Sequence, residues 1–139
     1  MIENGLYQQI VTNSAIKTAV GVDANGTTSA YWILAPQGAK IPFLILSRVA
    51  TTDNYGYGGT VGVRNSLFQV VCYASTYLAS RQIASVVRQA LQNFTGPLPD
   101  GTVVQSLFIE KDFDMSYEEG GKGFVYGAYI QFRVFSEEN

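Results

Sequence analysis

The chain has 139 residues, of which 47% are hydrophobic and 14% are charged, and its formal net charge is −2. This length fits a single domain over residues 1 to 139, and the hydrophobic share excludes an intrinsically disordered chain. The nine basic residues form no run, which excludes the electrostatic surface typical of a nucleic-acid-binding protein.

The N-terminal part is predicted to contain one helix and one short strand. Apolar residues recur at helical spacing from Ile2 to Val11, which predicts the helix. Thr12 to Ser29 has no clear period and includes turn residues, so we expect a loop with a short irregular piece around Ile16 to Val20. Ala30 to Ala35 is rich in aromatic and branched residues and predicts the strand.

Two longer strands are expected in the middle of the sequence. Pro42 precedes a strand from Phe43 to Thr51 that is apolar on both faces, which is typical of a central strand. The glycine-rich run from Asp53 to Gly62 predicts an adaptable connection that is too long for a two-residue hairpin turn. A second strand follows from Val63 to Ala74, and its alternate residues are expected to share one face: Phe68, Val70, Cys72 and Ala74.

An amphipathic helix follows that strand directly. Ser75 is expected to cap a helix that begins at Thr76 and is stopped by Gly96 and Pro97. Its apolar stripe comprises Ala79, Ile83, Val86, Val87, Ala90, Leu91 and Phe94. Its opposite, polar face comprises Ser80, Arg81, Ser85, Arg88, Gln89 and Gln92.

The C-terminal part predicts a strand from Thr102 to Asp112, a polar loop from Asp114 to Gly123, and an alternating strand from Phe124 to Phe135. The whole order is α-β-β-β-α-β-β. We therefore predict an α+β domain in which a mostly antiparallel sheet of about five strands carries two helices on one face.

The residue types argue against catalysis. Histidine is absent, which excludes Ser–His and Cys–His nucleophile pairs and removes the commonest metal ligand. The single cysteine, Cys72, is expected to be a small core residue, and one cysteine fits a reducing compartment. We expect no enzyme activity and no cofactor.

The glycine-rich connection departs from a phosphate-binding pattern because Val61 occupies a glycine position and because the run joins two strands. We interpret it as an inter-strand arm whose Tyr55 and Tyr57 dock on another chain. The acidic residues Asp112, Asp114, Glu118 and Glu119 do not have the spacing of a calcium loop. A solvated hairpin is the favoured interpretation, and a small ligand- or metal-binding α+β domain is the alternative.

The share of charged residues is low, because about 25% is typical of a soluble domain. This bears on whether other chains cover the surface. Nine tyrosines and eight phenylalanines accompany it, which favours a surface covered by other chains over a neutral monomer. The first residues lack the basic and apolar regions of a secretory leader, and no segment is long enough to span a bilayer. We expect a protein made in a cytoplasm, with no membrane partner.

Several motifs occur in a characteristic order: Pro42 to Ile45, Thr51-Thr52, Gly58-Gly59, Phe68 to Ala74 (FQVVCYA) and Ile83 to Leu91 (IASVVRQAL). In this order they resemble the tail terminator (tail completion, head–tail joining) proteins of long-tailed bacteriophages. The resemblance covers the first two thirds of the chain by motif and the last two strands by topology alone.

The resemblance implies a siphovirus-like virion structural protein that forms a ring, commonly a hexamer, on the head-proximal end of the tail tube. Its implied partners are further copies of itself, the tail tube protein and the head-completion (connector) protein, with DNA only passing through the lumen. The implied location is the head–tail junction of the virion, and the host cytoplasm before assembly. Another phage neck or minor tail protein is the nearest alternative.

Ten residues are candidates for contacts with a neighbouring subunit or the tail: Arg48, Asp53, Tyr55, Tyr57, Arg64, Asp112, Asp114, Glu118, Glu119 and Lys122. Arg48 and Arg64 lie on the strands on either side of the glycine-rich run. We expect them to pair with the acidic hairpin of a neighbouring subunit, and the alternative is that both are solvated arginines at a sheet edge.

Overall fold

A computed structural model of the protein describes residues 2–21, 28–33, 41–56, 59–92, 94–99, 101–118 and 124–137. These residues form the following helices and strands: α1 (Ile2–Val11), α2 (Ser14–Val20), β1 (Ala30–Trp32), β2 (Phe43–Gly56), β3 (Gly59–Ala74), α3 (Tyr77–Leu91), β4 (Gly96–Pro97), β5 (Val103–Glu118) and β6 (Phe124–Glu137).

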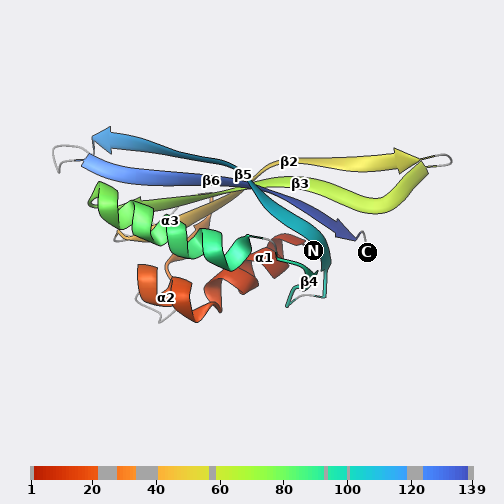
Figure 1. Cartoon of the computed structure of the whole chain (residues 1–139), viewed down its shortest axis with the longest axis horizontal. Helices are drawn as coiled ribbons and strands as arrows, with labels where there is room; N and C mark the ends of the chain where they lie inside the picture. The colour runs from red at the N-terminus through yellow and green to blue at the C-terminus, as the bar shows by residue number, and fades with distance from the viewer. Residues whose placement is uncertain are drawn as a thin grey trace.

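The strands form one sheet in the order β1-β2-β3-β6-β5-β4, in which β1 and β2 are parallel and every other pair is antiparallel. All three helices lie on one face of this sheet (Figure 1). The α+β class is therefore confirmed. The predicted order was wrong, because the described residues contain a second short helix and a two-residue strand, β4, that the sequence did not predict.

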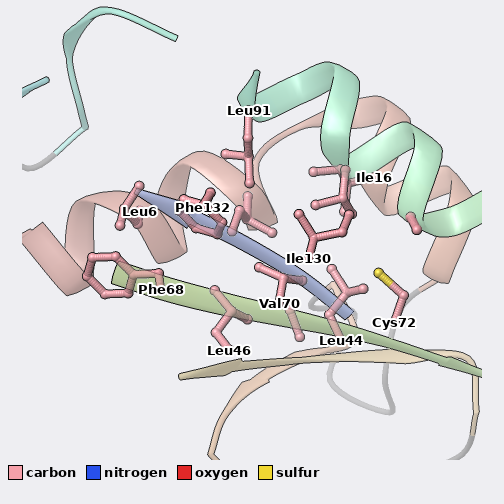
Figure 2. Packing of buried hydrophobic residues seen from close by; sticks show 14 of the residues in the cluster. Leu6, Ile16, Leu44, Leu46, Phe68, Val70, Cys72, Leu91, Ile130 and Phe132 are labelled. Carbon is pink, nitrogen blue, oxygen red and sulfur yellow. The ribbon is translucent and has the colours of Figure 1, made fainter. Parts of the chain in front are cut away.

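The core lies between the helices and the central strands. Alternate side chains of β2, β3 and β6 point to the helix side, where they meet side chains of the helices such as Leu6, Ile16 and Leu91 (Figure 2). Phe68 on β3 stacks on Phe132 on β6 with 5.9 Å between ring centroids. The residues predicted to share one face of β3 are all buried, as expected: Phe68, Val70, Cys72 and Ala74.

The first helix has the predicted bounds, but the segment after it is more ordered than expected. α2 begins because the Asn13 side chain accepts a hydrogen bond from the backbone N–H of Ile16 at 3.1 Å. It ends at Gly21, whose φ of 79° lies in the left-handed region that glycine tolerates. Ile16 and Val20, one turn apart, are buried and hold the helix to the core.

Helix α3 differs from its prediction at both ends. Thr76 is the N-cap, since its hydroxyl accepts a hydrogen bond from the N–H of Ala79 at 3.2 Å, and the helix ends at Leu91. Ser80, predicted on the polar face, is buried. Its hydroxyl donates to the Tyr77 carbonyl oxygen at 2.7 Å, which allows this polar side chain to leave water.

The connection predicted from Asp53 to Gly62 was wrong, because most of it is strand. β2 continues to Gly56 and β3 starts at Gly59, and these two residues face each other across the ladder. Threonine, tyrosine and valine between the glycines favour strand, and this preference outweighs the turn signal of the glycines. Only residues 57–58 separate the two strands, and they lie outside the described residues.

The acidic loop was also placed too early. β5 continues to Glu118, so Asp114 lies on the same strand as Asp112, the last residue of the predicted strand. The signal was present in the sequence, because Phe113, Met115 and Tyr117 alternate with polar residues at the period of a strand. The β2–β3 and β5–β6 hairpins project at opposite ends of the long axis of the molecule (Figure 1).

Candidate assembly surface

An ion-pair network joins strand β5 to helix α3. The guanidinium of Arg81 places Nη1 2.8 Å from Asp112 Oδ1 and Nε 2.8 Å from Asp114 Oδ1. Arg88 Nη1 donates to Asp112 Oδ2 at 3.0 Å, and the Tyr77 hydroxyl donates to Asp114 Oδ2 at 3.2 Å. Both carboxylates predicted in a solvated hairpin are thus engaged by their own chain.

Not every contact in this network is a hydrogen bond. Arg81 Nε is close to Asp114 but not aligned for donation, and neither Nε nor Nη2 has a hydrogen-bond partner among the described residues. Burial lowers the pKa of Arg81, and the hydrogen bond to Asp112 and the two carboxylate charges more than offset this, so its pKa is raised. Arg81 therefore stays positively charged between α3 and β5.

This network was not predicted from the sequence, where Arg81 and Arg88 were placed on the polar face of the helix without a partner. The signal was the spacing of Tyr77, Arg81 and Arg88, which places all three on one side of a helix, opposite a strand with two aspartates two residues apart. Ion pairs between a charged helix face and an acidic strand can be predicted only when the two elements are known to pack together.

Cys72 is buried under this region on the helix side of β3 (Figure 2), as predicted for a core residue. Burial raises the pKa of its thiol well above the usual range, while the charge of Arg81 lowers it and that of Asp112 raises it. The thiol stays protonated at neutral pH, and a protonated thiol is a poor nucleophile and a poor metal ligand.

A second polar network lies on the face of the sheet that the helices leave uncovered. Arg133 on β6 donates to Glu110 Oε2 on β5 at 2.9 Å and to Asn65 Oδ1 on β3 at 2.7 Å. Further along β6 and β3, Gln131 Nε2 donates to Gln69 Oε1 at 2.9 Å. These cross-strand contacts align β3, β6 and β5 without help from a helix.

The remaining interface candidates are distributed along the hairpins. Arg48 is exposed on β2, and Arg64 is half-buried on β3, opposite Asp53. Tyr55 lies opposite Thr60 near the end of the hairpin, and Glu118 is the last residue of β5. Tyr57, Glu119 and Lys122 lie outside the described residues. The pairing of Arg48 and Arg64 with a neighbouring subunit stays a prediction.

The largest exposed apolar side chains gather at the outer strands of the sheet. Val49 lies on β2, Ile33 directly follows β1, and three more lie on β5: Phe108, Phe113 and Met115. The other two, Tyr77 and Leu78, begin α3, where Tyr77 contacts β5. Apolar surface that is concentrated in this way is typical of contacts with other chains.

The described residues offer little support for a small-ligand or metal site. A shallow cavity of about 210 Å³ lies between α2 and α3, lined by Ala19, Pro42, Ala74, Ser75, Ala79, Gln82, Ile83 and Val86. It contains no charged side chain and is smaller than ordinary ligand pockets, which begin at about 300 Å³. In the described ranges no three Cys, Asp or Glu side chains are grouped as a metal site would require. None of the helices described is long and apolar enough to cross a membrane.

Comparisons with known proteins bear on the whole chain. A family model described as "Tail completion protein gp17" matches residues 4–136. The fold is similar to that of a chain from the "Virion of native gene transfer agent (GTA) particle", with a TM-score of 0.69 and 18% sequence identity. That likeness covers 98% of this chain and 94% of the other, and at this identity it concerns the fold alone. No curated protein matches the sequence.

Proposed function

The chain belongs to the tail completion protein gp17 family, and on this basis we propose that it forms a ring on the head-proximal end of a bacteriophage tail tube. The ring stops polymerisation of the tube and joins the tail to the head. The observation that carries this proposal is the family match, which extends over residues 4–136. The similar fold of a virion chain supports it.

The surface supports assembly into a closed ring. A ring needs heterologous contacts, in which two different patches of each copy meet. The exposed apolar side chains lie at both outer edges of the sheet, and thus offer two such patches. By resemblance to tail terminators the ring is a hexamer, and its further partners are the tail tube protein and the head-completion (connector) protein.

The charge of the chain fits a conduit for DNA. A net charge of −2 with scattered basic residues provides little attraction for phosphates, so DNA can pass through the lumen without being held. The role is structural, and no catalytic step is part of it. The protein acts in the virion at the head–tail junction and is in the host cytoplasm before assembly.

The position of the protein in the particle tests this proposal. We expect gold-labelled antibodies, or a tag seen by electron cryomicroscopy, at the head–tail junction. Particles made without the protein should have heads and tails that fail to join, and tails of uncontrolled length. A label at the distal tip of the tail, or normal joined tails without the protein, would contradict the proposal and favour another neck or minor tail protein.

A further inference from the structure

Two strands of the sheet have long open edges. β1 covers β2 only from Leu44 to Leu46, and β4 covers β5 only at Val103 and Val104. Along residues 47–56 of β2 and 105–118 of β5, no described strand lies on the outer side. We call these two stretches the β2 edge and the β5 edge. Open edges of this length are templates for pairing with another chain.

The apolar side chains follow these edges closely. Val49 is on the β2 edge, and Ile33, which is 70% exposed, lies where β1 ends and that edge begins. Phe108, Phe113 and Met115 are on the β5 edge. Five of the seven large apolar residues exposed in the described ranges are therefore placed where an added strand would cover them.

The polarity of the strands suits a head-to-tail continuation of the sheet. β2, β3, β6 and β5 are neighbours in this order and each pair is antiparallel, so β2 and β5 also run in opposite directions. If a second copy is added beside β5 by the head-to-tail repeat that a ring requires, with its helices on the same face, its β2 is the strand that arrives. That new pair is antiparallel, which is the better aligned kind of ladder.

We propose that the β5 edge of one copy pairs with the β2 edge of the next copy, so that the sheets of neighbouring subunits form one continuous belt. This rests on the ring proposed above and names the contact that closes it. The contact is heterologous and repeats in one direction, as ring closure requires. The two hairpins lie at opposite ends of the long axis, so that one copy presents one edge at each end (Figure 1).

Register shifts in both edge strands limit which residues can form the contact. The register of β2 shifts around Val49 and Asn54, and that of β5 shifts around Gln105 and Glu110. Such shifts protect edges from indiscriminate pairing. From residue 111 to residue 118 the β5 ladder is regular, and this stretch carries the exposed Phe113 and Met115. Residues 111–118 are thus the part of β5 on which the neighbouring strand docks.

Cysteine cross-linking in assembled particles tests the contact. Val49→Cys is combined in turn with Phe108→Cys, Phe113→Cys or Met115→Cys in the full chain, and particles are treated with a short bismaleimide. We expect at least one pair to give a ladder of covalent oligomers up to the closed ring, while each single variant gives none. The matched control combines Val49→Cys with Gln89→Cys, an exposed position on α3.

A second measurement needs no variant. Hydrogen exchange of the backbone amides is compared between the isolated wild-type chain and the chain in particles, and residues 47–53 and 111–118 should lose exchange on assembly. A ladder from the Gln89→Cys control, dimers from Phe113→Cys alone, or unchanged exchange of residues 111–118 would overturn the proposed pairing. If the label remains at the head–tail junction in those cases, the proposed function stands; if it does not, the function itself fails.

Discussion

The same strands form the helix-covered centre of the sheet and its two projecting hairpins, but the two regions differ in the burial of their apolar side chains. In the centre, side chains on the helix side are buried, as Leu44, Val70 and Ile130 are completely. Toward the hairpin ends the apolar side chains are exposed, as Phe113 and Met115 are on β5. The centre therefore holds the fold together, and the β5–β6 hairpin keeps apolar surface available for other chains.

The two hairpins also differ from each other. The β5–β6 hairpin is joined to α3 by Arg81, Arg88 and Tyr77, which hold the acidic residues of β5. The β2–β3 hairpin extends away from the helices (Figure 1), and its strands are held by their own ladder. The β5–β6 hairpin is thus fixed in direction by contacts with a helix as well as by its ladder.

The largest effect is expected in the centre. Phe132→Ala removes a fully buried ring that stacks on Phe68, and should lower the free energy of unfolding by about 3–5 kcal/mol. Phe108→Ala, on the β5 edge, removes a half-exposed ring that stacks on Phe135 and should cost about 1 kcal/mol or less. Urea unfolding of both variants measures the difference. Equal losses would show that the edge contributes to the fold as much as the centre does.

The next effect concerns the link between α3 and the β5–β6 hairpin. Arg81→Ala leaves Asp112 and Asp114 without their main cation and should lower the free energy of unfolding by about 1–2 kcal/mol. The loss should shrink in high salt because the pairs are partly solvent-exposed. A double-mutant cycle with Asp112→Ala measures the coupling, and additive losses from the two changes would exclude a real pair. Exchange of the β5 amides should rise in Arg81→Ala and not in the control Gln89→Ala.

A smaller loss of stability is expected at the N-terminus of α3, where Ser75 and Thr76 should differ. Thr76→Ala removes the N-cap hydroxyl and should lower the free energy of unfolding by about 1 kcal/mol. Ser75→Ala, at an exposed neighbouring position, should change it by no more than about 0.5 kcal/mol. Thermal unfolding of the two purified variants decides which residue is the cap, and a greater loss from Ser75→Ala would reverse the assignment.

The cap illustrates what sequence reasoning could reach. It found the helix but not its first residue, because serine and threonine both favour the N-cap and the choice depends on which backbone angles the preceding strand leaves available. Patterns of period 2 placed the central strands correctly, since Phe68, Val70 and Cys72 bury one continuous face. They failed near the hairpin ends, where glycine and aspartate resemble a loop although the ladder continues.

The candidate site was harder to predict for a physical reason. Asp112 and Asp114 were recognised as a group, but their partners on α3 are separated from them by 24 residues or more along the chain. A single sequence carries no information about which helix packs on which strand. The open edges depend in the same way on strand order, which a single sequence does not specify.

The smallest effect at neutral pH comes from Cys72, directly under the helix that holds the β5–β6 hairpin. Because burial raises the pKa of this thiol in the folded state, the unfolded chain alone loses the proton once the pH exceeds about 8.5. Stability is therefore unaffected below that pH and falls above it, by at most about 1.4 kcal/mol per pH unit. Cys72→Ala should be less stable overall, because a buried group is removed, but its stability should fall less steeply between about pH 8.5 and pH 10.

Urea unfolding of the wild type and Cys72→Ala across this pH range measures the difference, because the two chains differ only at this thiol. Parallel curves would mean that the thiol meets water in the folded state. The same burial predicts that Cys72 does not react with a maleimide at neutral pH until the chain unfolds. A wild-type chain that reacts in the folded state would contradict this, and would show that the centre of the sheet opens without global unfolding.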